Sequence, residues 1–247
     1  MQQGYSQRRK RKGVRLILGF VVMAFLIGSA GAFRADASLI APDPGLPPLG
    51  GEYTTPDSEF FAEYSGPDFD VVLSYVRLGN FTGVVQTEVG SDEHESFGAT
   101  LSGFAEFHID SSVESTFFQL TGPVEFIILN KAGYETGLFD AKIVSMEFSG
   151  NLPLPSDDMV ILIRESPTTM SLGAMEIISQ GDGTFQIESF FDVATELSVD
   201  GGQSWICSRP ETRRMELHPA PVPEPATMLL FGFGLMGLLG VRRKFKN

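Results

Sequence analysis

The sequence predicts an all-β fold, with a single β-sandwich-like domain between an N-terminal signal peptide and a C-terminal transmembrane helix. The central part of the chain consists of short runs rich in Val, Ile, Phe and Thr, separated by turn residues at intervals of roughly 8 to 15 residues. No amphipathic helix of three turns stands out there. An uncharged apolar segment lies near each end of the chain, where a signal peptide and a membrane helix are expected.

Residues 1–37 are predicted to form the signal peptide. A basic region precedes an apolar segment from Leu16 to Ile27, which is the order found in secretory signals. The basic residues are Arg8, Arg9, Lys10, Arg11, Lys12 and Arg15. Small residues then offer two cleavage sites, one after Ala32 and one after Ala37, and an uncleaved signal anchor is the alternative. We therefore expect export through the general secretory route.

Residues 38–57 are expected to form a linker. Closely spaced prolines and glycines leave this stretch little room for regular structure. They are Pro42, Pro44, Pro47, Pro48, Gly50 and Gly51. The predicted β-domain therefore covers residues 58–218.

The β-domain contains eleven candidate strands. Many short strands joined by turns are typical of a two-sheet sandwich. The candidates are Val71–Leu78, Phe81–Val89, Ala99–Ile109, Ser115–Leu120, Val124–Leu129, Lys142–Phe148, Val160–Arg164, Met175–Ser179, Phe185–Phe190, Thr195–Val199 and Ser204–Cys207. Two glycine-containing turns, 181–183 and 200–202, supply the positive φ angles that tight turns need.

One of these runs shows which residues face the core. In Ala99–Ile109, small or apolar side chains alternate with polar ones, which predicts a strand with one buried face. The inward set is Leu101, Gly103, Ala105, Phe107 and Ile109, and the outward set is Thr100, Ser102, Glu106 and His108. Phe104 breaks the pattern, because it falls on the polar face.

The charge of the body excludes a nucleic-acid partner. The whole chain has a net charge of −13, but residues 38–241 contain 7 Lys and Arg against 30 Asp and Glu, a net charge of −23. A nucleic-acid-binding domain needs a basic surface. Such acidity favours solubility outside the cell and loose association with divalent ions.

Little in the body indicates chemistry. Cys207 is the single cysteine, so neither an internal disulfide nor a multi-cysteine metal site is possible. The segment Asp92–Glu95 is densely acidic and could bind a cation, but a solvated loop is the preferred interpretation. The histidines, His94, His108 and His218, have no paired spacing, and no nucleophile elbow, zinc-protease motif or phosphate loop is present. We therefore predict no catalytic residues, metal or cofactor, and a protein that is not an enzyme.

The stretch from Ser198 to Trp205 resembles an Asp-box, the S-x-D-x-G-x-[ST]-W hairpin that recurs in sialidases and other propellers. The resemblance implies that Asp200 holds the turn and that Trp205 packs in the core. The sequence contains one copy, and residues 58–218 are too few for a six-bladed propeller. We therefore expect a structural role for this hairpin rather than a catalytic one.

The C-terminal segment, residues 219–247, has three parts in a fixed order. A short motif, Val222, Pro223, Glu224 and Pro225, precedes an uncharged apolar run, residues 226–241. As a helix this run would be about 24 Å long, slightly shorter than the roughly 30 Å hydrocarbon core of a bilayer. Arg242, Arg243 and Lys244 follow as a membrane stop, at the end expected to be cytoplasmic.

This arrangement resembles the PEP-CTERM signal of Gram-negative bacteria, which is read by membrane protease-transpeptidases called exosortases. The resemblance implies an exosortase and the membrane as partners, and an inner-membrane precursor that later reaches the cell surface or the extracellular space. It also implies association with exopolysaccharide and biofilm. The leading hypothesis is therefore a non-enzymatic surface or matrix protein. The alternative is an exported carbohydrate-binding or carbohydrate-active β-domain.

Overall fold

The computed structural model describes residues 38–48, 50–56, 60–109, 112–152 and 159–220, and these are all-β, as predicted. They contain thirteen strands and no helix. The strands are β1 (Leu39–Ala41), β2 (Gly51–Thr54), β3 (Ala62–Ser65), β4 (Phe69–Val89), β5 (Asp92–Ile109), β6 (Ser112–Ile128), β7 (Gly137–Leu152), β8 (Met159–Glu165), β9 (Leu172–Ser179), β10 (Phe185–Val193), β11 (Thr195–Ser198), β12 (Ile206–Cys207) and β13 (Arg213–Pro219).

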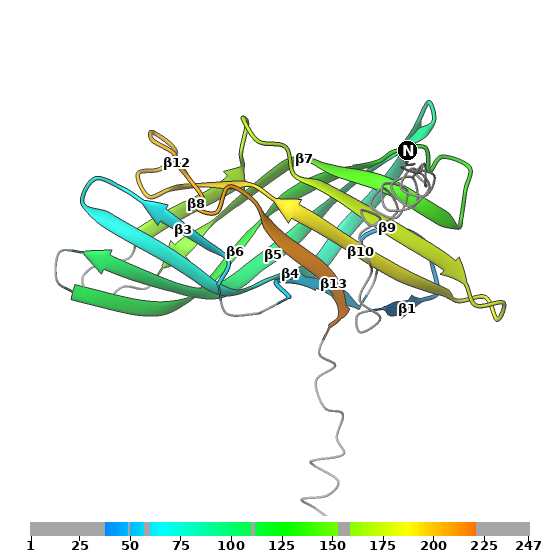
Figure 1. Ribbon diagram of the computed structural model, residues 1–247, viewed down its shortest axis with the longest axis horizontal. Helices are drawn as coiled ribbons and strands as arrows, with labels where there is room; N and C mark the ends of the chain where they lie inside the picture. The colour runs from blue at the N-terminus through cyan, green and yellow to red at the C-terminus, as the bar shows by residue number, and fades with distance from the viewer. Residues whose placement is uncertain (1–37, 49, 57–59, 110–111, 153–158, 221–247) are drawn as a thin grey trace, which may run out of the picture. The chain divides into compact units, whose positions relative to one another are not determined.

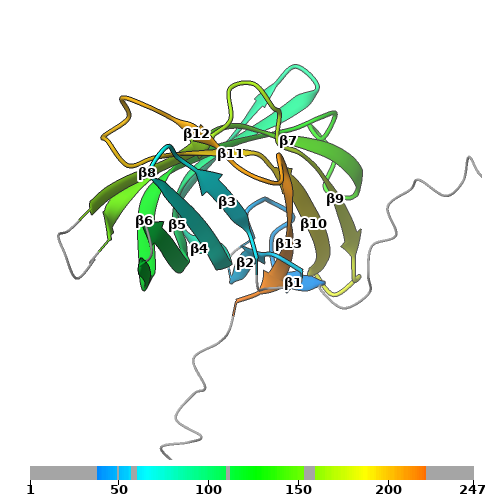
Figure 2. The same ribbon diagram turned by 60° about the vertical axis from the view of Figure 1, so that its left-hand side comes forward.

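All thirteen strands belong to one antiparallel sheet that closes on itself (Figures 1 and 2). Strand β9 pairs with β10 along one edge and with β7 along the other. Within the described residues this closes a ring of eight strands in the order β7-β9-β10-β13-β2-β4-β5-β6. The expected sandwich of two sheets is therefore wrong. A closed sheet needs no second sheet, because its own opposite walls cover its inner face.

The predicted strands correspond to observed ones, but two pairs of them are continuous. Strand β4 spans Val71–Leu78 and Phe81–Val89, and β6 spans Ser115–Leu120 and most of Val124–Leu129. The break that the sequence indicated in β4 is a register shift within the strand. Asn80, at φ 52°, lies in this shift. Pro123, which lacks an N–H donor, falls in a gap in the β6–β7 pairing.

The segment expected to be a linker contributes two strands to the sheet. Leu39–Ala41 pairs with β10, and Gly51–Thr54 lies between β13 and β4 inside the ring. Leu39, Ala41 and Tyr53 are buried. The prolines that argued against regular structure lie between these strands, so they did not prevent pairing on either side.

Aromatic side chains fill the inside of the ring. Phe126 contacts Tyr53, Phe97 and Phe191, with ring centroids 6.4, 5.0 and 4.5 Å apart. The void left among the surrounding side chains is about 10 Å³, which is at most the space of one water molecule. The hydroxyl group of Tyr53 donates to Ser189 Oγ at 3.1 Å, and burial raises the pKa of this tyrosine.

The alternation predicted for β5 is confirmed. Leu101, Ala105 and Phe107 are buried, whereas Phe104 is 46% exposed on the outer face. The neighbouring strand β4 explains why position 103 is a glycine. A Cβ at Gly103 would meet Ser74 O at 2.8 Å, so glycine lets β4 approach at that point.

A carboxylate and an amine are buried at the start of β5. Glu93 and Glu95 come from the acidic segment that we expected to be a solvated loop, but they belong to a strand and face inward. Lys131 Nζ donates to Glu93 at 2.5 Å, and Glu95 accepts from the backbone N–H of Leu46 at 3.0 Å. Burial, and then the hydrogen bond with Glu93, raise the pKa of Glu95 to about 9.

The close contact of β6 with β7 depends on Gly122. A Cβ at this position would overlap the carbonyl group of Glu147 and contact the backbone of Phe148. We predict that Gly122→Ala lowers the free energy of unfolding by about 2 to 3 kcal/mol, because two strands of the ring must separate. Chemical denaturation measures the change. Gly79→Ala is the control, since its Cβ would come no closer than 3.3 Å to Glu52 Cβ and 3.9 Å to any backbone atom. Equal losses in the two variants would contradict the prediction.

The raised pKa of Glu95 makes stability depend on pH. The unfolded chain releases this proton near pH 4.5 and the folded chain near pH 9, so the folded state binds the extra proton between these values. The free energy of unfolding should therefore fall as pH rises through this window, by up to about 1.4 kcal/mol per pH unit. Glu95→Gln should remove this slope, measured by denaturation at several pH values. Glu125→Gln, at an exposed position of β6, should leave it in place. An unchanged slope in Glu95→Gln would refute the assignment.

Candidate functional site

The hairpin between β11 and β12 has the internal bonding that the Asp-box resemblance implies. Asp200 Oδ1 accepts from the backbone N–H groups of Gln203 and Ser204, both at 2.9 Å, and Asp200 Oδ2 accepts from Ser204 Oγ. Gly201 and Gly202 have φ angles of 73° and 88°, which suit glycine. The Ser204 bonds hold the pKa of Asp200 well below its usual range. The predicted role of Asp200 in holding the turn is confirmed.

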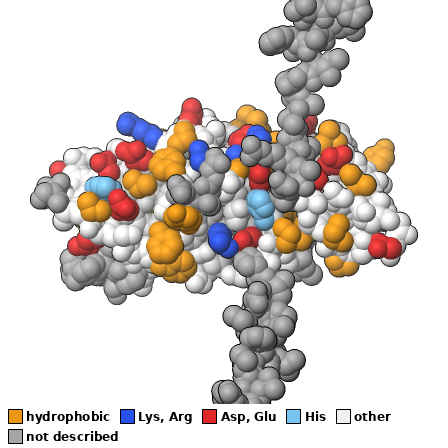
Figure 3. All heavy atoms as spheres, turned by 60° about the horizontal axis from the view of Figure 1, so that its bottom comes forward, with side chains coloured by type: hydrophobic (Ala, Val, Ile, Leu, Met, Phe, Trp, Pro, Cys, Tyr) orange, Lys and Arg blue, Asp and Glu red, His pale blue; other side chains and the backbone are white. Residues whose placement is uncertain are grey.

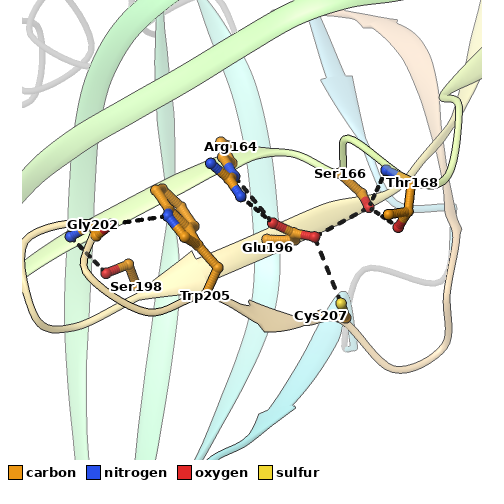
Figure 4. Close-up of polar contacts among 8 residues, drawn as sticks. All are labelled: Arg164, Ser166, Thr168, Glu196, Ser198, Gly202, Trp205 and Cys207. Carbon is orange, nitrogen blue, oxygen red and sulfur yellow. Dashed lines mark hydrogen bonds and ion pairs between the residues drawn. The ribbon is translucent and has the colours of Figure 1, made fainter.

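We expected Trp205 to pack in the core, but the structure does not place it there. Its side chain is half-buried, and its indole N–H donates to Gly202 O at 3.1 Å within the same hairpin (Figure 4). The guanidinium group of Arg164, on β8, lies 3.8 Å from the centre of the indole ring. Trp205 stays at the surface because its hairpin lies at the end of the strand path. There the guanidinium group of Arg164 covers one face of the indole ring.

Arg164 also pairs with a buried carboxylate. Its Nε and Nη2 atoms donate to Glu196 Oε2 at 3.0 and 2.7 Å, and Glu196 is 5% exposed. The other oxygen of Glu196 accepts from Ser166 Oγ at 3.4 Å and from Cys207 Sγ at 3.6 Å. Figure 4 shows these side chains meeting between β8 and β11. The Arg164–Glu196 pair therefore ties the Asp-box hairpin to the sheet.

The chemistry available to this cluster is limited. Burial, together with the carboxylate of Glu196, raises the pKa of the Cys207 thiol, which disfavours the nucleophilic thiolate. Glu196 is fully engaged with Arg164, Ser166 and Cys207. The arrangement is suited to holding two strands together and not to proton transfer at a substrate.

An open groove lies beside the cluster. Its lining includes Lys142, Glu147, Arg164, Glu165 and Met170, from β7, β8 and the segment that follows β8. Burial raises the pKa of Glu165, whose Oε1 atom accepts from the backbone N–H of Ser171 at 3.2 Å. Its Oε2 atom is buried and has no hydrogen-bond partner among the described residues.

The histidines are distributed over the sheet and do not form a site. His94 and His108 lie on β5, and His218 lies on β13. His108 Nε2 lies 2.7 Å from Glu106 Oε1 on the same strand. Among the described residues no group of three or more His, Cys, Asp or Glu side chains is placed to hold a metal ion.

Sequence reasoning missed the Arg164–Glu196 pair. Arg164 ends an apolar run, and Glu196 follows Thr195 in a short strand whose residues are all buried. A buried glutamate in such a strand requires a partner, but the sequence does not indicate which of seven basic residues supplies it. The only usable signal was the absence of alternation in β11.

The predicted sorting residues lie outside the described residues. They are Val222, Pro223, Glu224 and Pro225 of the motif and Arg242, Arg243 and Lys244 of the membrane stop. The signal peptide, residues 1–37, and the apolar run, residues 226–241, lie outside as well. Among the residues that the structure describes, no helix has the length and hydropathy that a membrane crossing requires.

Comparison with known proteins identifies one family model. The PEP-CTERM protein-sorting motif matches residues 221–244, so the resemblance drawn from the C-terminal segment is confirmed. This motif supports sorting of an exported protein by an exosortase. No curated protein and no solved structure matches the chain.

Removing Arg164 tests the link between the hairpin and the sheet. We predict that Arg164→Met costs about 2 kcal/mol of unfolding free energy, because Glu196 loses its charged partner; partial exposure of Arg164 keeps the loss below that of a fully buried pair. The emission of Trp205, the single tryptophan, should also change as the cation leaves its ring.

Two further variants control this measurement. Arg164→Met combined with Glu196→Gln should be less unstable than Arg164→Met alone, since no buried charge remains. Arg77→Met, which breaks an exposed pair with Glu52 at 3.0 Å, should cost less than about 1 kcal/mol. Similar losses for Arg77→Met and Arg164→Met would show that the Glu196 pair has no special role.

Proposed function

We propose that this protein is a non-enzymatic surface or extracellular-matrix protein, sorted by an exosortase and associated with exopolysaccharide or biofilm. The observation that carries the proposal is the PEP-CTERM motif at residues 221–244, together with the signal-peptide pattern of residues 1–37. In this proposal the protein is held as a membrane precursor and then delivered to the cell surface or the extracellular space. The association with exopolysaccharide follows from the resemblance alone.

The β-domain supports a structural role in two ways. Its interior is filled by aromatic side chains around a void of about 10 Å³, which is too small for an organic ligand. Its polar cluster at Glu196 is occupied by contacts within the protein. Both features favour a rigid unit that is displayed outside the cell.

The alternative, an exported carbohydrate-binding or carbohydrate-active domain, calls for a concave face that carries Trp205 or tyrosine side chains beside two carboxylates. Arg164 covers one face of Trp205, and the nearest buried carboxylate, Glu196, is paired with Arg164. This geometry disfavours glycosidase chemistry, which needs two carboxyl groups available on either side of a sugar. We therefore retain the non-enzymatic proposal.

Changing the motif tests the sorting step. In the native host, Glu224→Ala or Pro225→Ala should leave the precursor unprocessed in the membrane fraction, because the motif adjoins the apolar run where a membrane protease would act. Mass spectrometry of both protein termini, with and without the exosortase gene, measures the outcome. Glu211→Ala, at an exposed position of the β-domain, is the matched control and should be processed normally. Normal processing of the Glu224 and Pro225 variants would overturn the proposal.

A further inference from the structure

An exposed group of aromatic side chains crosses the outer face of three neighbouring strands. Tyr75 on β4, Phe104 on β5 and Phe117 on β6 are 47%, 46% and 52% exposed. Their rings meet edge to face, with centroids 6.2 Å apart for Tyr75–Phe104 and 5.7 Å apart for Phe104–Phe117. Hydrophobic side chains gather into a band in the space-filling view of Figure 3. We call these three residues the aromatic strip. Contiguous exposed apolar groups of this kind mark interaction surfaces.

The backbone is adjusted to present the strip. Tyr75 has a φ angle of 53°, a left-handed conformation that non-glycine residues rarely adopt. It lies in the register shift between Ser74 and Arg77, where β4 bulges against β5. Bulges re-aim side chains, and here the result is that Tyr75 projects outward beside Phe104.

The strip ends at a strand edge. Within the described residues, Ser112–Leu120 of β6 has registered partners in β5 alone, and pairing of β6 with β7 begins at Thr121 and Ser149, although Gly150 of β7 already lies against Gln119 and Leu120. Beyond that point β7 pairs with β8 through Leu152. A strand edge of this length is normally protected by lysine, proline or a bulge. Ser112–Leu120 contains neither lysine nor proline, and its only charged side chain is Glu114, which is half-buried opposite Phe107.

The edge strand itself carries little charge for so acidic a domain, although Glu106 and His108 of β5 lie beside Ser115 and Val113. Ser112–Leu120 has a single ionisable side chain, Glu114, which is half-buried. Residues 38–241 have a net charge of −23, so two copies of the domain repel each other over most of their surface. Close approach of two copies is less unfavourable along such a lightly charged segment than across the acidic remainder of the surface.

We propose that a second copy of this chain docks here, with the two β6 edges paired antiparallel about a two-fold axis. An edge strand is self-complementary in this arrangement, because each backbone donor meets an acceptor of the other copy. Val113, Ser115, Phe117 and Gln119 are exposed, and they alternate along the outer face. Pairing therefore brings the two Phe117 side chains onto one continuous outer face, joining the two aromatic strips.

A cysteine scan tests the pairing in the full-length protein. In a Cys207→Ser background, single cysteines replace Val113, Ser115, Phe117 or Gln119, and membranes of the native host are oxidised with a mild thiol oxidant. The residue nearest the two-fold axis should give a covalent dimer that the other positions give weakly. Leu138→Cys, on β7 and 67% exposed, is the control and should remain monomeric. Dimers at none of the four positions, or in equal amount at all four and at the control, would overturn the proposal.

Placing charge on the edge provides a second test that does not depend on cysteine reactivity. Val113→Lys and Ser115→Lys should shift the solubilised protein from dimer to monomer by at least tenfold in dissociation constant, measured by sedimentation equilibrium. Leu138→Lys adds the same charge at a more exposed position away from the edge, and it should leave the dimer in place. A monomeric wild-type protein, or equal weakening by Leu138→Lys, would contradict pairing through β6.

Discussion

The pairing of β9 with both β7 and β10 is the constraint on which the rest of the structure depends. It joins β7 to β10 and so closes the run of strands β10-β13-β2-β4-β5-β6-β7 into a ring. The inner face of the sheet is then shielded from solvent. Residues that point inward from β5, β6, β7 and β10 therefore meet across the ring. The contacts among Tyr53, Phe97, Phe126 and Phe191 depend on that closure. So does the burial of Glu93 and Glu95, because their segment becomes part of the wall.

Local features were predictable from the sequence because local rules determine them. The alternation in Ala99–Ile109 indicated a half-buried strand, and the Ser198–Trp205 pattern indicated a turn tied by Asp200; both are observed. Closure was not predictable, since pairing between β9 and β7 joins segments that are distant along the chain. The same reason explains why Leu39–Ala41 and Gly51–Thr54 were taken as linker. Each is too short to form a strand by itself, and each acquires regular structure from its neighbours in the sheet.

The burial of three polar residues was also not predictable from the sequence. Glu93, Glu95 and Glu196 are glutamates in a strongly acidic chain, and composition gives no reason to bury them. Each is buried with a distant partner, namely Lys131 for Glu93, Leu46 for Glu95 and Arg164 for Glu196. Trp205 is the opposite case, since a residue expected in the core remains at the surface under a cation. In each case the partner across the fold, and not the residue type, decided the environment.

The place of β13 has a mechanical consequence. This last strand ends at Pro219, two residues before the sorting motif begins at residue 221, and it lies inside the ring between β10 and β2. Any tension applied through the C-terminal segment therefore reaches the domain at a strand whose last residues, Glu216–Pro219, pair with β2 and whose first residues, Arg213–Glu216, pair with β10. An edge strand could peel away one bond at a time under such a load. Detaching β13 requires the ladder with β2 and then the ladder with β10 to break, so loss of the first ladder alone does not release the strand.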